Sequence, residues 1–448
     1  MTGFPISQAS PVAHDGTLRE RADVVVIGGG IIGVMSAWFL AERGLSVVLL
    51  EKGRIAGEQS SRNWGWIRAQ GRDPAELPIM IEARRIWQGL EAECGEDLGL
   101  RQGGVLYLAK DAAELEKFEA WTAHARAHDL DTRLLSSAEA AALLPDAARQ
   151  WPGGLWTASD CRAEPWLAVP ALARAAVRKG VTLRENCAVR GLDIAGGRIA
   201  GVITENGRVA TSEVVLAGGA WSSLLLRRHG VRIPQLSVRA PVAATEPLPE
   251  VFAGAAADAK IAFRRRLDGG YTLAPADFHE LFIGPDAFRN LRVFLPQLRD
   301  NPFGTRYLPA SPGGYPDAWR TARRWALDGP SPFEAMRVLN PVPNRAQTAR
   351  LVREFAQVFP GLGAPRIKLA WAGMIDSMPD LVPVIDRAAA LPGLTIATGM
   401  SGHGFGIGPG IGRVIADLVT GGDVGHDLGR FRLSRFSDGT KLAPGPAL

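Results

Sequence analysis

The sequence contains little cysteine and no long apolar segment. Its three cysteines, Cys94, Cys161 and Cys187, are too few and too scattered for a disulfide framework, and none belongs to a Cys-x-x-Cys pair of the kind that binds metal. No apolar run approaches the roughly 20 residues that a membrane-spanning helix needs. These absences exclude a disulfide-stapled secreted domain and a membrane span, and we expect a cytoplasmic protein without a metal site.

Charge of one sign is not concentrated anywhere in the chain. The formal net charge is +5, and the arginines that produce it are scattered, with no stripe of basic and aromatic residues. We interpret this charge as solvated surface and expect no nucleic-acid partner. The opening residues 1–20 lack the uninterrupted apolar core of a secretion signal, so we expect them to form a loose tail.

Residues 24–51 have the pattern of a βαβ unit. The apolar run Val24–Ile27 predicts a buried parallel strand, a helix is expected over 31–43, and residues 46–50 predict a second strand that ends at Glu51. A unit of this length that begins with a strand is typical of nucleotide-binding sheets.

Between the first strand and the helix lies a glycine fingerprint, Gly28-Gly29-Gly30-Ile31-Ile32-Gly33. Gly28 permits a tight turn, Gly30 lets the backbone approach a pyrophosphate, and Gly33 lets the helix pack closely on the strand. The helix N-terminus then presents free N–H groups to the phosphates. Glu51 stands where a carboxylate accepts hydrogen bonds from ribose hydroxyls, which favours NAD or FAD over NADP.

Three further blocks follow the fingerprint along the chain. They are Ser60-Ser61-Arg62-Asn63-Trp64-Gly65-Trp66, Val214-Val215-Leu216-Ala217-Gly218-Gly219-Ala220-Trp221 and Thr398-Gly399-Met400-Ser401-Gly402-His403-Gly404-Phe405-Gly406. Together with the fingerprint and its Glu51-Lys52 end, they resemble the D-amino-acid oxidase family of flavoproteins, which includes glycine and sarcosine oxidases and D-amino-acid dehydrogenases. The resemblance spans nearly the whole chain, and it implies FAD as the cofactor.

The glycine-rich last block makes chemical sense beside a flavin. Gly402, Gly404, Gly406 and Gly408 would let backbone N–H groups reach a flat ring, and a helix expected to begin near Gly408 would direct its positive end at the N1/C2 edge. The residues expected to contact FAD are Gly28, Gly30, Ile31, Ile32, Gly33, Glu51, Lys52, Ser61, Arg62, Asn63, Trp64, Val189, Ala217, Gly218, Gly219, Trp221, Gly402, His403, Gly404, Phe405 and Gly406. No cysteine or histidine occurs between residues 51 and 73 or around 371–380, so we expect non-covalent FAD.

The predicted fold class is α/β, with a Rossmann-like FAD-binding domain interleaved with an α+β substrate domain built on a mixed sheet. We assign residues 21–75, 161–235 and 370–448 to the FAD-binding domain. Residues 76–160 and 236–369, where strands and later prolines are frequent, are assigned to the substrate domain.

The resemblance implies oxidation of a C–N bond in an amino acid or a secondary or N-substituted amine. A hydride passes to flavin N5 and the imine is hydrolysed, so positioning matters more than a strong base. Two alternatives remain open: a 2-hydroxy-acid dehydrogenase, or a flavin subunit that needs partner chains as in heteromeric opine and sarcosine dehydrogenases. Dioxygen and a quinone both remain possible electron acceptors.

The substrate side departs from the family pattern. Ile375 stands where relatives often carry an arginine that clamps the substrate carboxylate, and an aliphatic side chain cannot make that bidentate bond. The carboxylate is then held elsewhere, or the substrate lacks an ordinary one. Arginines that could hold it are Arg68, Arg264, Arg265 and Arg266.

Several other residues have two interpretations. Asp376 either faces a substrate ammonium or makes a turn bond, and Asp380 is expected to be structural. His279 and His403 either line the pocket or are packed or solvated, and Trp64 and Trp66 either wall a substrate pocket or belong to the core. The substrate-pocket candidates are therefore Trp66, Arg68, Arg264, Arg266, Asp376 and His403.

Overall fold

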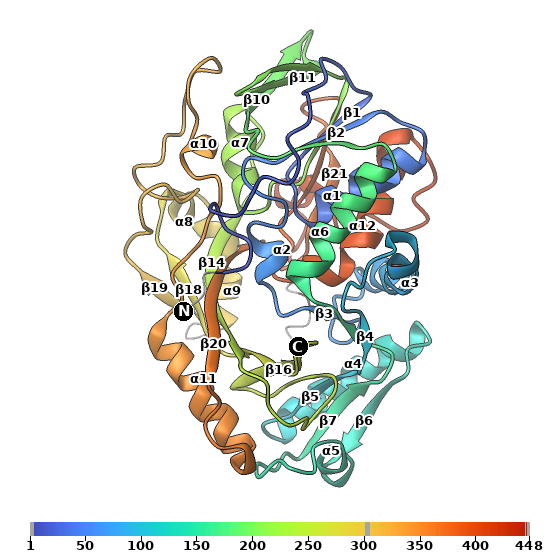
Figure 1. Ribbon diagram of the computed structural model, residues 1–448, viewed down its shortest axis with the longest axis vertical. Coiled ribbons are helices and arrows are strands. Elements are labelled where there is room, and N and C mark those ends of the chain that lie inside the picture. The colour runs from blue at the N-terminus through green and yellow to red at the C-terminus, as the bar shows by residue number, and fades with distance from the viewer. Residues whose placement is uncertain (1–3, 301–304, 444, 446–448) are drawn as a thin grey trace.

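The computed structural model describes residues 4–300, 305–443 and 445. Two sheets organise the chain (Figure 1): a six-stranded sheet with its helices fills the upper right of the view, and a ten-stranded sheet runs down the left side and along the bottom. The six strands lie in the order β21-β22-β13-β1-β2-β9. They are β1 (Val24–Ile27), β2 (Val47–Leu50), β9 (Thr182–Arg184), β13 (Glu213–Leu216), β21 (Val384–Arg387) and β22 (Leu394–Thr398).

The first sheet is parallel except at one edge. The central β1 pairs in parallel with β2 and β13, which carry apolar residues at nearly every position, and only β21 runs antiparallel. Strands buried on both faces have this composition. Helices α1 (Ile31–Glu42), α3 (Leu77–Cys94), α6 (Pro165–Arg178) and α12 (Gly404–Thr420) pack together beside it. The small sheet β10 (Val189–Ala195), β11 (Arg198–Thr204) and β12 (Gly207–Ala210) and helix α7 (Ser222–Arg228) share a second core with it.

Helix α12 begins at Gly404, so the expected start near Gly408 is wrong. The later glycines are helical and serve a close helix–helix contact. A Cβ on Gly408 would lie 2.6 Å from Ile31 Cγ1, and a Cβ on Gly412 would lie 2.6 Å from the backbone of Met35, both on α1. These glycines let two helices pack closely against each other, rather than letting the backbone approach a ligand.

The second sheet is mixed. Its order is β19-β18-β14-β17-β16-β15-β5-β7-β6, with β20 also paired to β14, and the β5–β15 and β18–β19 pairs are parallel whereas the other pairs are antiparallel. The strands are β5 (Val105–Leu108), β6 (Thr132–Ser136), β7 (Gly153–Thr157), β14 (Leu236–Thr245), β15 (Ala255–Ala257), β16 (Ile261–Arg265), β17 (Tyr271–Pro275), β18 (His279–Phe282), β19 (Thr305–Leu308) and β20 (Ile367–Ser377). The remaining elements are α2 (Gln59–Arg62), α4 (Ala112–Ala127), α5 (Ser137–Leu143), α8 (Pro285–Arg289), α9 (Leu291–Asp300), α10 (Pro332–Ala335), α11 (Arg345–Val358), β3 (Trp66–Ile67), β4 (Arg101–Gln102) and β8 (Cys161–Arg162).

This architecture confirms the predicted α/β class, with a Rossmann-like parallel sheet beside a mixed one. The division into domains at particular residues stays a prediction. Strand β20 begins at Ile367, crosses the boundary expected at residue 370, and pairs with β14 along nearly its whole length.

Residues 4–20 are anchored and do not form the expected loose tail. Phe4 is buried, with its ring centroid 5.9 Å from that of Trp166 and 5.5 Å from that of Trp371. The guanidinium of Arg62 lies 4.1 Å from the same ring. The Phe4 side chain thus ties this segment to α2, α6 and β20.

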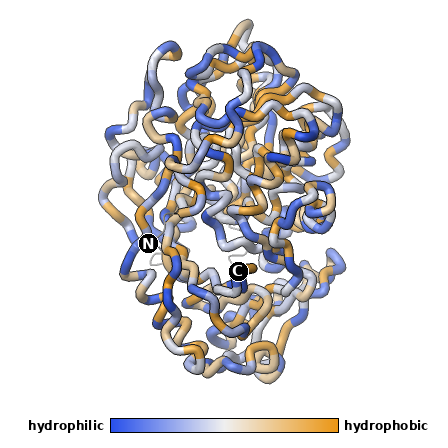
Figure 2. Tube along the Cα trace, viewed as in Figure 1, coloured by the Kyte–Doolittle hydropathy of each residue, from blue (hydrophilic) through white to orange (hydrophobic). Residues whose placement is uncertain are grey.

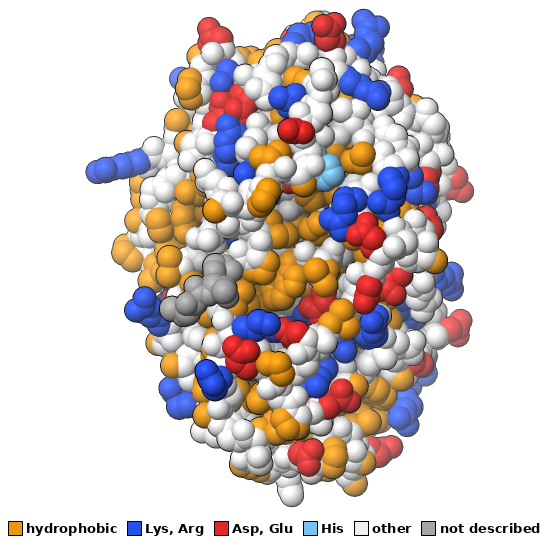
Figure 3. Space-filling model, in the orientation of Figure 1, with side chains coloured by type: hydrophobic (Ala, Val, Ile, Leu, Met, Phe, Trp, Pro, Cys, Tyr) orange, Lys and Arg blue, Asp and Glu red, His pale blue; other side chains and the backbone are white. Residues whose placement is uncertain are grey.

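Hydrophobic residues follow the strands and helices through the interior, and hydrophilic residues follow the outer loops (Figure 2). On the face drawn in Figure 3, hydrophobic side chains gather across the middle, with charged side chains above and below. Within the described residues, no helix combines the length and apolarity needed to cross a membrane.

Candidate functional site

A cavity of about 560 Å³ lies where the carboxyl ends of the parallel strands meet the second sheet. Parallel α/β sheets bind ligands at this edge, and the volume suits a small-molecule ligand. The first sheet lines the cavity with the residues that follow β1, β2 and β13, and the second sheet lines it with side chains of β5, β14 and β20.

The turn after β1 has the geometry that the fingerprint predicts. Gly28 has φ +111°, and a Cβ there would lie 2.4 Å from the carbonyl oxygen of Ala217. A Cβ on Gly33 would lie 1.9 Å from the carbonyl oxygen of Gly28, so Gly33 packs behind the turn rather than lining the cavity. Gly30 is the N-cap of α1 and has no side chain to cap the helix, and the first two helical residues, Ile31 and Ile32, line the cavity.

The carboxylate of Glu51 lies at the tip of β2 on the cavity wall. It accepts hydrogen bonds from the backbone N–H of Gly29 and of Gly53, each at 2.7 Å. Burial raises the pKa of Glu51 to about 7, against the opposing effect of Lys52. The ammonium of Lys52 pairs with Glu58 at 2.6 Å and lies 4.4 Å from the centre of the Trp221 ring.

The segment 58–73 contains the short helix α2 and strand β3. Ser60, not the predicted Ser61, faces the cavity, and its Oγ accepts a hydrogen bond from the backbone N–H of Ile31 at 2.9 Å. Ser61 is fully buried behind it and donates to the carbonyl oxygen of Ala56. Two adjacent serines give no sequence signal for which one points inward.

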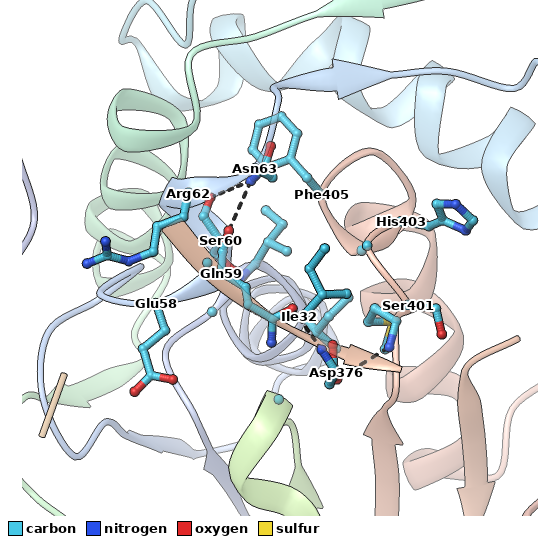
Figure 4. Close-up of a pocket in the computed structure, with 18 of the residues that line it drawn as sticks. Ile32, Glu58, Gln59, Ser60, Arg62, Asn63, Asp376, Ser401, His403 and Phe405 are labelled. Carbon is cyan, nitrogen blue, oxygen red and sulfur yellow. Dashed lines mark hydrogen bonds between the residues drawn. The ribbon is translucent and has the colours of Figure 1, made fainter. Parts of the chain in front are cut away.

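Arg62 and Asn63 shape this loop. Arg62 is buried, donates to the carbonyl of Gly57 and to Asn340, and has its pKa lowered to about 10 by burial, so it is not a surface arginine. Asn63 donates to the carbonyl of Ser60 at 2.9 Å and accepts from the N–H of Gly65 at 2.7 Å. In Figure 4, Glu58 and Arg62 lie on one side of the site, and Ser401 and His403 lie on the other.

The N-terminus of α12 meets the same cavity. Gly402, His403, Gly404 and Phe405 line it, and the N-cap His403 makes no side-chain cap bond. Gly406 lies behind the cavity, where a Cβ would be 3.1 Å from Ile67 Cα. The cavity thus receives the positive ends of two helices, α1 and α12, which favours an anionic or electron-rich ligand.

The carboxylate of Asp376 holds the loop before α12. Its Oδ2 accepts hydrogen bonds from the N–H of Gly399 at 2.7 Å and of Met400 at 3.3 Å, and burial raises its pKa. These contacts correspond to the turn-bond interpretation. Asp380 receives two hydrogen bonds from Arg435, at 2.8 and 3.1 Å, and is structural as expected.

Three of the four candidate substrate arginines lie away from the cavity. Arg264 is 1% exposed and makes a bidentate ion pair with Glu164 at 2.9 and 3.1 Å. Arg266 pairs with Asp268. Arg265 donates to the carbonyl of Leu248 at 2.9 Å. All three are absent from the cavity lining, which Arg68 reaches.

Aromatic rings wall the far end of the cavity. The ring centroids of Trp64 and Trp66 are 5.4 Å apart, those of Trp66 and Tyr107 are 6.0 Å apart, and Phe118 continues the row. All four rings line the cavity, as does His279. Burial lowers the pKa of His403 well below its usual value, and Arg72 and Arg68 add to this effect.

Most of the residues predicted to contact FAD surround this one cavity. Those that line it are Gly28, Gly30, Ile31, Ile32, Glu51, Lys52, Arg62, Asn63, Trp64, Val189, Ala217, Gly218, Gly219, Trp221, Gly402, His403, Gly404 and Phe405. Sequence reasoning missed Glu58, Gln59 and Ser60 in the lining. No three His, Cys, Asp or Glu side chains within the described part of the chain are placed to hold a metal ion.

Comparison with known proteins gives consistent results. A family model described as FAD dependent oxidoreductase matches residues 23–418. The solved structure of L-amino acid deaminase from Proteus myxofaciens, in complex with anthranilate, is 32% identical with a TM-score of 0.91, over 96% of this chain and 97% of that one. Sarcosine oxidase subunit beta from Rhizobium meliloti is 26% identical over 94% of this chain and 90% of that protein. Human mitochondrial sarcosine dehydrogenase is 31% identical over 51% of this chain, and the match covers only 26% of the length of that protein.

Proposed function

This chain belongs to the FAD dependent oxidoreductase family, and from that premise we propose that it oxidises the C–N bond of an amino acid or of a secondary or N-substituted amine. The observation that carries the proposal is the continuity of the cavity. One end is a dinucleotide cradle at Gly28, and the other is an aromatic wall that includes Trp66 and Tyr107. The relatives reported above are named for amino acids or for sarcosine, which supports a substrate with a C–N bond.

The residues around the cavity fit FAD. Gly28 can carry no side chain without striking the backbone of Ala217, and the N-termini of α1 and α12 both face the space beyond it. We propose that the N-terminus of α1 holds the pyrophosphate and that Glu51 accepts the ribose hydroxyls. The loop from Gly402 to Phe405 would then present backbone N–H groups to the flavin.

The protein contributes binding, orientation and electrostatics to this reaction. Bound FAD supplies the hydride acceptor, and the imine that the substrate becomes is hydrolysed by water. The rings of Trp64, Trp66 and Tyr107 exclude water from the reacting carbon and fix its approach. The N-terminus of α12 places partial positive charge at this end of the cavity.

We also propose that FAD is held non-covalently in a cytoplasmic enzyme. The cysteines Cys94, Cys161 and Cys187 are free and buried, and none lines the cavity. Unpaired thiols are typical of a reducing compartment. Acid precipitation should release all of the yellow colour into the supernatant, and colour that stays with the polypeptide would show a covalent bond.

A second candidate is a flavin subunit that works only with partner chains. It is favoured by the similarity to sarcosine oxidase subunit beta over 94% of this chain. The two candidates make different predictions for the isolated protein, because a self-sufficient enzyme reduces its own flavin when substrate is added.

The test is anaerobic addition of substrates to the purified chain while the flavin absorbance is recorded. The panel consists of D- and L-amino acids, N-methyl amino acids, simple amines and 2-hydroxy acids. Bleaching by an amino acid or amine supports the proposal, and bleaching by hydroxy acids alone favours the alcohol alternative. No bleaching until a co-expressed partner is added would favour the subunit alternative.

A further inference from the structure

A second cavity, of about 270 Å³, lies next to the cavity proposed to hold FAD, which we call the FAD cavity. It is enclosed between one end of the second sheet, at β14, β18 and β19, and the helices α8 and α9, all of which lie together at the left of Figure 1. One water molecule occupies about 30 Å³, so the second cavity is large enough for a ligand with a substituted ring.

The two cavities lie on the same face of the second sheet. Side chains alternate between the two faces of a strand, so Leu236, Val238 and Ala240 of β14 point the same way. Leu236 and Val238 line the second cavity, whereas Ala240 lines the FAD cavity. The neighbouring β20 is divided in the same way, because Ile375 lines the FAD cavity and Ser377 lines the second cavity.

The wall between the two cavities is thin. Val238 and Ile375 are paired directly across the β14–β20 ladder, yet each lines a different cavity. The Cα atoms of such a pair are about 5 Å apart, and Ile375 and Ser377 are about 7 Å apart along β20. A Cβ on Gly402, in the loop proposed to face the flavin, would lie 3.8 Å from Ile375 Cδ1. Electrons tunnel through protein over separations of this order, so ligands in the two cavities can exchange them.

The lining of the second cavity selects an uncharged ligand. It is mainly apolar, with side chains such as Leu281 of β18, and among the described residues it includes no charged side chain. Its polar members are Gln297, Thr305, Tyr307 and Ser377, which offer an amide and three hydroxyl groups as hydrogen-bond donors. A carboxylate or phosphate would be buried here without a counter-charge, whereas a carbonyl group would find donors.

Exposed apolar side chains surround the second cavity. Phe288, Leu291 and Tyr307 belong to its lining, and they are 62%, 51% and 41% exposed. The ring of Trp319, which is 54% exposed, lies 5.9 Å from that of Phe288. Large apolar side chains gathered around a cavity mouth are typical of a site for an apolar ligand.

We propose that the second cavity binds a quinone, which accepts the electrons removed from the substrate. A quinone is a flat, uncharged ring whose carbonyl oxygens accept hydrogen bonds, as this lining requires. The proposal rests on the proposed function and names the electron acceptor of that reaction. Oxidation of one C–N bond leaves two electrons and one proton on the bound cofactor. The quinone takes both electrons and two protons, one from the reduced cofactor and one from solvent, and becomes a hydroquinone while the cofactor is reoxidised.

The test measures quinone binding and flavin reoxidation separately, on FAD-loaded protein. In the first experiment, ubiquinone-1 is added to the oxidised protein, and quenching of tryptophan fluorescence reports its binding. In the second, the flavin is reduced by light and EDTA, without any substrate, and is mixed anaerobically with ubiquinone-1 while its absorbance is recorded. We expect saturable binding and a reoxidation rate that saturates with quinone concentration.

The variant Ala287→Phe adds a ring to the lining of the second cavity from a partly exposed position on α8. It should weaken ubiquinone-1 binding and slow reoxidation by ubiquinone-1 at least about 10-fold, and the rate relative to reoxidation by dioxygen should fall by the same factor. The matched control is Ala123→Phe, which adds the same ring at an exposed position on α4 and should match wild type. If Ala287→Phe does not fold, Tyr307→Phe takes its place, with an expected loss of affinity of about 2- to 10-fold.

Three results would overturn the proposal. They are failure of the wild-type protein to bind ubiquinone-1, equal behaviour of the cavity variant and Ala123→Phe, and equal slowing of reoxidation by dioxygen and by ubiquinone-1 in the cavity variant. The last result would make the second cavity a path for oxygen. Failure of the proposed function looks different, because no amino acid or amine would bleach the flavin, while the light-reduced flavin would still be reoxidised by ubiquinone-1.

Discussion

Replacement of Arg264 by methionine should destabilise the protein without affecting its ligand site. Arg264 and Glu164 are 1% and 4% exposed and form a bidentate pair. Without the guanidinium, the Glu164 carboxylate stays buried with the N–H of Leu267, at 3.0 Å, as its remaining charge-stabilising donor. Loss of one partner of such a pair costs about 3–5 kcal/mol of unfolding free energy.

The destabilisation should also depend on pH. Burial alone would raise the pKa of Glu164, but Arg264 outweighs that effect and holds the pKa below its usual value. In wild type this group therefore adds stability at neutral pH that is lost as the pH falls through its lowered pKa. In Arg264→Met the pKa of Glu164 should rise instead. The loss of unfolding free energy relative to wild type should therefore be largest at neutral pH, and it should shrink in acid as the Glu164 carboxylate takes up a proton.

Urea unfolding followed by tryptophan fluorescence, at neutral and acid pH, measures this deficit. The double variant Arg264→Met/Glu164→Leu should recover much of the stability, because an apolar pair replaces a buried charge. The apparent affinities for FAD and substrate should stay at wild-type values in the folded fraction. A stable Arg264→Met protein with a strongly raised KM would refute the reasoning and return Arg264 to the substrate site.

Three further changes test other parts of the structure. Gly408→Ala should lower the free energy of unfolding by about 1–3 kcal/mol and speed FAD release, because the new Cβ would lie 2.6 Å from Ile31 Cγ1. The control Gly361→Ala, whose Cβ would have no atom within 4 Å, should change that free energy by less than about 0.5 kcal/mol. Equal effects of the two changes would be inconsistent with tight packing of α1 against α12. Burial raises the pKa of Glu51 from 4.5 to about 7. The contribution of Glu51 to the stability of the apoprotein is therefore fully present below pH 4.5 and is lost as the pH rises through about 7. Glu51→Gln should abolish this dependence in thermal melts and weaken FAD about 10-fold or more in titrations, and an unchanged affinity would remove Glu51 from the FAD site. Phe4→Ala should cost about 3 kcal/mol in chemical denaturation, and no change would mean that the N-terminal segment is not anchored.

The βαβ fingerprint could be predicted because its physics is local. The turn at Gly28 and the close packing at Gly33 follow from strand, turn and helix patterns within about 30 residues. The region from residue 236, where the sequence predicts frequent strands, does contain β14, β16 and β17, since runs of apolar and β-branched residues mark them.

What could not be predicted depends on contacts between distant segments. Gly408 reads as a loop glycine until α1 is seen packed against it, because the sequence does not state which helix approaches. The choice between Ser60 and Ser61 depends on the orientation of a one-turn helix. Arg264 resembled a substrate residue because its partner Glu164 lies 100 residues earlier in the chain.

The most direct test of the account is the product formed when the purified protein reduces its own flavin. With one amino acid that bleaches the flavin under anaerobic conditions, we predict one equivalent of ammonia or amine released per equivalent of flavin reduced, together with the matching oxo acid. Flavin reduction that yields an oxidised product without release of ammonia or amine would contradict the assignment of this cavity to C–N bond oxidation.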